Sequence, residues 1–135
     1  MAKFRPRKTD NTLLLVGLAC LAALLVYKFY NREGFNADSP TSISNGTVVL
    51  FYSKSCAHCS KLEPVWEQIT TKYGTKVLAI DCTTPTAATT AAMNKYSVTA
   101  FPTVVCINST GNATPYTGDK TLDDLSSFID QCTSS

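Results

Sequence analysis

The chain has 135 residues, of which 44% are hydrophobic and 16% charged, and its formal net charge is +2. This composition excludes a chain that is disordered throughout, and the small charge excludes a strongly basic nucleic-acid-binding protein. About 30 residues at the N-terminus are unsuited to a globular core, which leaves about a hundred residues for one domain.

The N-terminal region combines a basic tail with an apolar run. Residues 1–11 contain four basic side chains, and Leu13 to Tyr27 carries no charge. We predict a membrane anchor over residues 12–30, because a helix of this length nearly spans a bilayer core of about 30 Å. A cleaved signal peptide is the alternative, but no small-x-small cleavage site follows the run. Cys20, inside the run, is expected to be an ordinary apolar residue of the anchor.

The basic residues before the run outnumber those that closely follow it, which predicts a cytoplasmic N-terminus. The protein would then be a single-pass membrane protein with a cytoplasmic tail over residues 1–11. The rest of the chain would face an extracytoplasmic space, which could be a lumen, a periplasm or the exterior of a virion. Sequons for N-glycosylation at Asn45, Asn108 and Asn112 would matter only in a eukaryotic secretory pathway.

Residues 31–45 lack apolar periodicity and are expected to form a linker, which leaves residues 46–135 for the folded domain. The elements expected there are a strand over 47–52, a helix ending at Gly74, a strand over 76–80, a helix over 86–96, strands over 103–107 and 113–117, and a last helix beginning at Thr121. This β-α-β-α-β-β-α order predicts an α/β domain, with a central sheet, parallel crossovers and helices on both faces.

A Cys-x-x-Cys motif, Cys56-Ala57-His58-Cys59, lies where the first strand ends and a helix begins. The free N–H groups and the dipole of a first helical turn stabilise a thiolate. We therefore expect Cys56 to be an exposed nucleophile with a low pKa and Cys59 to be a more buried resolving thiol. His58 is expected to stabilise the thiolate and thereby tune the reduction potential. The two cysteines are close enough in sequence to form a Cys56–Cys59 disulfide.

Two other interpretations of the motif remain. A zinc site needs a second pair of ligands at suitable spacing, and the only histidine in the chain is His58, inside the motif. A purely structural disulfide closing so short a loop would stabilise the fold only slightly. Redox chemistry is favoured over both, and it requires no bound metal or organic cofactor.

The domain resembles the thioredoxin superfamily, and most of all a protein-disulfide-isomerase catalytic module. The motif CAHC differs by one residue from the isomerase CGHC, and Pro64 matches the kink proline of the active-site helix. Phe101-Pro102-Thr103 resembles the cis-proline segment of the family, and Tyr116-Thr117-Gly118 its Tyr-x-Gly segment. The resemblance implies a thioredoxin-like fold with a mixed four-stranded sheet, and it implies that Phe101 and Pro102 hold an incoming peptide against Cys56.

The sequence departs from the family pattern at informative positions. Leu50 replaces a buried acid that is thought to accept the proton of the second cysteine, and Ser55 replaces an aromatic residue. These changes question the speed of catalysis and the choice of substrate more than the type of reaction. Asp81, near the end of a strand, is a candidate substitute proton acceptor, although a solvated strand-end acid is the commoner situation.

The remaining cysteines have structural interpretations. Cys106 lies in a strand expected to be buried, and we predict a packed core thiol. Cys82 and Cys132 can pair with each other or stay free, and the sequence leaves both possibilities open.

These observations together predict a membrane-anchored thiol–disulfide oxidoreductase or isomerase. Its substrates would be protein thiols and disulfides, and a redox partner would recycle the Cys56–Cys59 pair. Two alternatives stay open: a thioredoxin-like binding or chaperone adaptor with little turnover, and a cytosolic reductant tethered to the membrane.

Overall fold

The structure, a computed structural model, describes the backbone of residues 11–30 and 43–135 and the side chains of residues 15–27 and 43–135. The chain divides into two compact units, Met1–Glu33 and Gly34–Ser135. The predicted basic tail lies almost wholly outside the described residues, as does most of the predicted linker.

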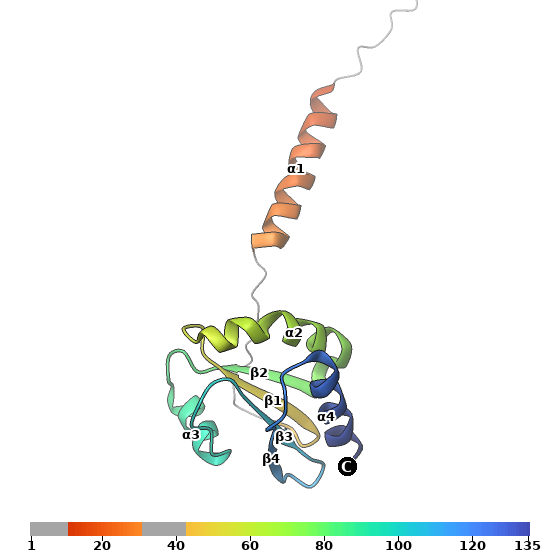
Figure 1. Cartoon of the computed structure of the whole chain (residues 1–135). Helices are drawn as coiled ribbons and strands as arrows, with labels where there is room; N and C mark the ends of the chain where they lie inside the picture. The colour runs from red at the N-terminus through yellow and green to blue at the C-terminus, as the bar shows by residue number, and fades with distance from the viewer. Residues whose placement is uncertain (1–10, 31–42) are drawn as a thin grey trace, which may run out of the picture. The chain divides into compact units, whose positions relative to one another are not determined.

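In the first unit the structure describes the helix α1 (Asn11–Tyr30), drawn in orange in Figure 1. Its large apolar side chains between Leu15 and Tyr27 are all 56–66% exposed, so the helix has no apolar stripe packed against a core. Among the residues that the structure describes, no helix is long and apolar enough to cross a membrane. The anchor over residues 12–30 stays a prediction.

The second unit is built on a mixed four-stranded sheet in the order β2-β1-β3-β4 (Figure 1). Its elements are β1 (Thr47–Tyr52), α2 (Ala57–Tyr73), a 3-10 turn (Gly74–Lys76), β2 (Val77–Asp81), α3 (Ala87–Lys95), β3 (Thr103–Ile107), β4 (Ala113–Pro115) and α4 (Leu122–Ser134). The predicted elements are confirmed in order and type. β4 is shorter than predicted and ends at Pro115, although the next residue, Tyr116, still donates its N–H to the Val104 carbonyl oxygen of β3 at 2.8 Å.

The directions of the strands determine which segments meet at the end of β1. β1 and β2 are parallel, as the β-α-β pattern predicts, but β3 runs antiparallel to β1. The expectation of parallel crossovers is therefore correct for α2 and wrong for the connection through α3. Because Phe51 pairs with Thr103, the start of β3 lies at the end of β1. The segment before β3 is thus brought to the place where the Cys-x-x-Cys motif begins.

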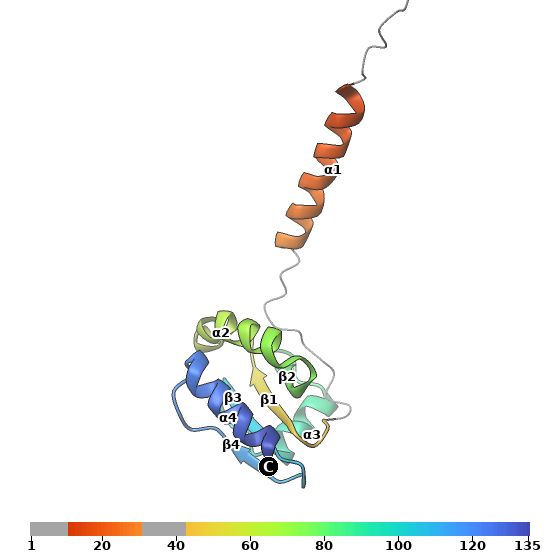
Figure 2. The ribbon, with the colours of Figure 1, turned by 90° about the vertical axis from the view of Figure 1, so that its right-hand side faces the viewer.

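Alternate side chains of β1 face two layers of helices. Val48, Leu50 and Tyr52 belong to one core cluster, which α2 and α4 cover. Val49 and Phe51 belong to a second cluster on the other face, which includes Ala92 of α3. Figure 2 shows α4 and α3 on either side of β1. Every residue of β1 is buried because both faces are covered, as its continuous apolar sequence predicts.

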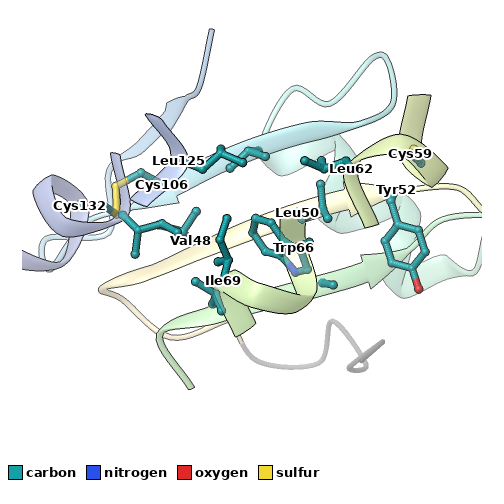
Figure 3. Packing of buried hydrophobic residues seen from close by; sticks show 14 residues of the cluster. Val48, Leu50, Tyr52, Cys59, Leu62, Trp66, Ile69, Cys106, Leu125 and Cys132 are labelled. Carbon is teal, nitrogen blue, oxygen red and sulfur yellow. A yellow bond between two sulfur atoms is a disulfide. The ribbon is translucent and has the colours of Figure 1, made fainter. Parts of the chain in front are cut away.

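The cysteines in the core depart from the sequence-based expectation. Cys106 is not a free core thiol but forms a disulfide with Cys132, which joins β3 to α4. Cys82 is buried and free, so it does not pair with Cys132. The side chain of Cys106 belongs to the cluster on the α4 face, and this placement, invisible in the sequence, decides the pairing. Figure 3 shows this disulfide and Cys59 at opposite ends of the same cluster.

Candidate active site

Cys56 occupies the N-cap position of α2, directly after the turn that follows β1. Its backbone is extended (φ −94°, ψ 117°), and its N–H donates a hydrogen bond to the Ser53 carbonyl oxygen at 3.1 Å. No side chain caps the helix. The backbone N–H groups of His58 and Cys59, in the first turn of α2, can donate to the Cys56 sulfur, where a negative charge is stabilised.

These groups lower the pKa of Cys56 below its ordinary value of 9.0. The backbone N–H of Cys59 contributes most, followed by the Cys59 thiol, while partial burial acts in the opposite direction and the backbone N–H of His58 adds a smaller effect. The side chain is half-buried, so the sulfur is accessible. Cys56 thus has the two properties of a reactive thiol, which are exposure and a stabilised thiolate.

Cys59 lies one turn further into α2 and is only 1% exposed. It packs in the cluster that contains Leu50, Leu62 and Trp66 (Figure 3). Burial raises the pKa of Cys59 to about 11, against a smaller opposing hydrogen bond from the Ser53 backbone. Both motif cysteines are free thiols in the structure. The pair therefore combines one thiol that ionises readily with one that holds its proton.

The loop before β3 lies against Cys56. The Cys56 thiol donates a hydrogen bond to the Phe101 carbonyl oxygen at 3.5 Å, and the Phe101–Pro102 peptide bond is cis. Phe101 packs against both core clusters, which fixes the position of its backbone. The segment thus lies beside Cys56, and its role in holding an incoming peptide stays a prediction.

A groove of about 420 Å³ opens beside the motif. Its six lining residues are His58, Lys61, Leu62, Phe101, Pro102 and Lys120. Leu62 is buried and belongs to the core, whereas His58, Lys61 and Lys120 are exposed. The groove therefore has an apolar floor and a basic margin.

The structure brings together the five predicted site residues, Cys56, His58, Cys59, Phe101 and Pro102, in and around this groove. The hydrogen bond from His58 to the Cys56 sulfur comes from its backbone N–H, and its imidazole lines the groove. The tuning role of the imidazole stays a prediction.

Lys120 was not foreseen as part of the site. It is distant from the motif in sequence, in an irregular loop between β4 and α4, and no sequence pattern marks it. Lys61 follows the motif closely, but its position at the groove depends on the orientation of the first turn of α2.

Asp81 is engaged elsewhere. Its carboxylate accepts a hydrogen bond from the Thr83 N–H at 2.8 Å and forms an ion pair with Lys54 at 3.3 Å. Burial disfavours its charge, but the Thr83 hydrogen bonds and Lys54 outweigh this effect and lower the pKa of Asp81. A carboxylate so stabilised is a weak base. Within the described side chains, no group of three His, Cys, Asp or Glu residues could hold a metal ion.

This α/β sheet, with a Cys-x-x-Cys pair at a helix start and a cis-proline loop against its first cysteine, defines a domain of the thioredoxin type. The profile of the family described as thioredoxin matches residues 28–131. The chain belongs to the thioredoxin family.

Characterised relatives include several disulfide isomerases. The chain is 30% identical over 91 residues to protein disulfide isomerase-like 1-1 of Arabidopsis thaliana and 35% identical over 88 residues to human protein disulfide-isomerase A4. These alignments cover 66% and 62% of this chain but only 18% and 14% of the relatives, so the chain spans less than a fifth of their length.

Solved structures show the same fold. The J-Trx1 fragment of ERdj5 superposes with a TM-score of 0.56 at 26% identity, over 65% of this chain and 43% of that one. The first thioredoxin domain of mouse protein disulfide-isomerase A4 superposes with a TM-score of 0.54 at 19% identity, over 77% of this chain and 83% of that one.

Proposed function

We propose that the protein is a thiol–disulfide oxidoreductase that acts on the thiols and disulfides of other proteins through Cys56 and Cys59. The observation that carries this proposal is the placement of the two cysteines within one helical turn, with Cys56 half-buried beside the Phe101 carbonyl oxygen and Cys59 only 1% exposed. The pKa of Cys56 is lowered, whereas that of Cys59 is raised to about 11. An exposed nucleophile and a buried, protonated second thiol are what a two-step disulfide exchange requires.

In the reducing direction, the Cys56 thiolate attacks one sulfur of a substrate disulfide. The substrate S–S bond breaks, a mixed disulfide forms, and the other substrate sulfur leaves as a thiolate that takes up a proton. Cys59 then loses its proton and attacks the Cys56 sulfur, which releases the second substrate thiolate. Two electrons pass to the substrate and a Cys56–Cys59 disulfide remains; the reverse sequence oxidises a protein dithiol.

The loop before β3 supplies a binding site for the substrate backbone. In the thiol form, the Phe101 carbonyl accepts a hydrogen bond from Cys56. The thiolate has no proton to donate and instead accepts hydrogen bonds from the Cys59 and His58 N–H groups. Ionisation thus frees the Phe101 carbonyl to accept an N–H from an extended substrate segment, and Pro102 borders the same groove.

We further propose that residues 12–30 anchor the protein in a membrane, with residues 1–11 cytoplasmic and the domain extracytoplasmic. The apolar, exposed side chains of α1 support an apolar environment for this helix. The Cys106–Cys132 disulfide supports an oxidising compartment, because such bonds are rare in the cytosol. In sealed vesicles whose cytoplasmic face is exposed to added protease, the domain is expected to be protected from digestion. Digestion of the domain in these vesicles would favour the membrane-tethered cytosolic reductant.

Turnover tests the proposal. The full chain is expected to reduce insulin or to refold scrambled ribonuclease, and Cys56→Ser is expected to lower the rate to background. Cys59→Ser is expected to accumulate mixed disulfides, because the first step occurs without the second. Cys82→Ala, which removes a buried thiol outside the pair, is the matched control. No turnover by the wild type, or equal turnover by Cys56→Ser, would contradict the enzymatic function.

A binding or chaperone adaptor is the second candidate, and one observation favours it. Leu50 is fully buried in the cluster that contains Cys59, where the family pattern has an acid. Without that acid, the proton of Cys59 has to leave by way of water or another group, and resolution could be too slow for turnover. Binding of unfolded protein that survives Cys56→Ser, without disulfide exchange, would support this candidate.

The direction of electron flow depends on the reduction potential of the pair, and a redox partner is needed to recycle it. A reduction potential of about −270 mV for the full chain would indicate a reductant. A potential of about −180 mV would indicate an isomerase or oxidase.

A further inference from the structure

We propose that the groove beside Cys56 selects substrates with an acidic side chain next to the reacting cysteine, and that Lys61 and Lys120 are the specificity-determining residues. The proposal rests on the oxidoreductase function proposed above, and it names the substrate class of the same site.

The position of the groove makes it part of the substrate path. Phe101 and Pro102 line it, and the Phe101 carbonyl oxygen lies 3.5 Å from the Cys56 sulfur. A polypeptide whose cysteine reaches Cys56 therefore places a neighbouring side chain over the groove. Its floor is apolar at Leu62, which suits the methylene groups of a Glu or Asp side chain.

The charge of the groove has one sign. Lys61 and Lys120 line it together with His58, and no carboxylate is among the lining residues. Within the part of the chain that the structure describes, the recorded ion pair is Lys54–Asp81, so neither groove lysine has an internal carboxylate partner. Glu63 and Asp119 are close to these lysines in sequence but do not line the groove. An acidic substrate side chain would supply the missing complementary charge.

Side-chain contacts of Tyr116 hold the backbone of the loop that carries Lys120. The Tyr116 hydroxyl donates a hydrogen bond to the Asp119 carbonyl oxygen at 2.7 Å, and the Tyr116 ring packs on Phe128 with centroids 4.7 Å apart. A Cβ at Gly118 would lie 2.5 Å from the same hydroxyl, so a larger residue there would force the Tyr116 side chain to shift. These contacts hold the backbone next to Lys120, which reduces the entropy cost of ordering the loop when a substrate binds.

The test compares blocked peptide disulfides that are identical except for Glu, Gln or Lys beside the cysteine. Second-order rate constants for their reduction by the full chain are measured at low and high salt. The Glu peptide is expected to react about 2- to 5-fold faster than the Gln peptide at low salt, with the Lys peptide slowest. The preference is expected to shrink towards unity in about 0.5 M salt. Equal rates for the three peptides would overturn the proposal.

Charge reversal provides the specific variants. Lys61→Glu with Lys120→Glu is expected to invert the order of the three peptides, and Lys120→Gln alone to weaken the preference. Lys72→Gln is the matched control, because Lys72 lies at the far end of α2 over the Tyr73 ring and not at the groove. Retention of the acidic preference by the double variant would overturn the proposal.

Two measurements separate specificity from other effects. Alkylation rates give the pKa of Cys56 in the double variant, and this pKa should change too little to explain the inverted order of the peptides. A decrease in rate constant that is equal for the three peptides would overturn the proposal. Reduction of a small neutral disulfide should be the same in the control Lys72→Gln as in the wild type. If the wild type fails to reduce that compound, the oxidoreductase function itself is wrong; if it succeeds without preferring the Glu peptide, only the inference about substrates is wrong.

Discussion

The Cys56 thiol and the Phe101 carbonyl oxygen lie 3.5 Å apart although 45 residues separate them in sequence. The contact joins the start of α2 to the loop before β3, and it exists because β3 runs antiparallel to β1 and begins where β1 ends. This arrangement, and the domain that supports it, can be tested by alkylation, denaturation and mutation.

Alkylation of the two motif cysteines should depend on pH in different ways. Cys56 should react with a midpoint below 9.0, whereas Cys59 should stay unreactive until the pH approaches about 11. Mass spectrometry after timed alkylation measures both. In Cys59→Ala the midpoint of Cys56 should rise but stay below 9.0, because the thiol hydrogen bond is lost and the backbone N–H remains. A Cys56 midpoint at or above 9.0 in the wild type would contradict the site.

The stability of the reduced domain should follow the same shifts. A lowered pKa at Cys56 contributes stability that is present above the unfolded value and is lost as the pH falls through the folded pKa. The raised pKa of Cys59 contributes stability that is fully present at a pH below the unfolded pKa of 9.0. This stability is lost as the pH rises through the folded pKa of about 11. Urea denaturation between pH 8 and 12 should therefore show a decline that is weaker in Cys59→Ala.

Removal of the Cys106–Cys132 disulfide should destabilise the domain without abolishing disulfide exchange. The bond closes a separation of 26 residues, for which chain entropy gives about 3.5 kcal/mol. Cys106→Ala with Cys132→Ala should lower the free energy of unfolding by about 2–4 kcal/mol in urea titrations. Reduction of the wild type should produce a similar loss. Wild-type stability in the double variant would argue against the pairing.

Gly118→Ala should destabilise the loop that carries Lys120. The new Cβ would lie 2.5 Å from the Tyr116 hydroxyl oxygen and 2.7 Å from Cζ, and the ring cannot move freely because it packs on Phe128. We expect a loss of about 1–3 kcal/mol in the free energy of unfolding. Tyr116→Phe removes the closest atom, so the two changes together should cost less than the sum of the single losses. Additive losses would show that this contact does not constrain the loop.

Asp81→Asn should leave turnover unchanged, because the Asp81 carboxylate is engaged by Lys54 and Thr83 and its pKa is lowered. The stability loss should be below about 1 kcal/mol, since the Lys54 partner is exposed. Single-turnover kinetics of mixed-disulfide resolution provides the measurement. A slower resolution in Asp81→Asn would identify Asp81 as the proton acceptor after all.

Leu50→Asp should accelerate the resolving step, because a carboxyl group in the cluster with Cys59 can accept its proton. We expect an increase of about 10- to 100-fold in the breakdown of the mixed disulfide, at or below the lower end of the usual range of general-base effects. The buried polar group should cost about 3 kcal/mol of stability. Leu50→Asn should carry a similar cost without the acceleration. Equal rates in the two variants would show that proton transfer from Cys59 does not limit resolution.

Much of the fold was predictable because its signals are local. The continuous apolar run over 47–52 predicted a strand covered on both faces, and β1 is buried at every position. The break between that strand and an amphipathic helix placed Cys56 at the start of α2, where the helix dipole acts on its sulfur. Each of these conclusions depends on neighbouring residues alone.

Other features depended on the three-dimensional arrangement. The sequence offered Cys82 as the partner of Cys132, but the fold turns Cys106 towards α4, so that Cys106 forms the bond and Cys82 packs on the opposite face of the sheet. The direction of β3 was equally hidden, because strand polarity is set by pairing between segments distant in sequence.

The amino-acid sequence alone thus determined the placement of Cys56 and Cys59 at a helix start and the elements that carry them, since helix starts and buried strands are encoded by nearby residues. Only the tertiary structure decided that Cys106 is bonded to Cys132 and that Lys120 lines the groove. Those outcomes depend on how separate elements pack together, and side-chain packing is not written in any short stretch of the chain.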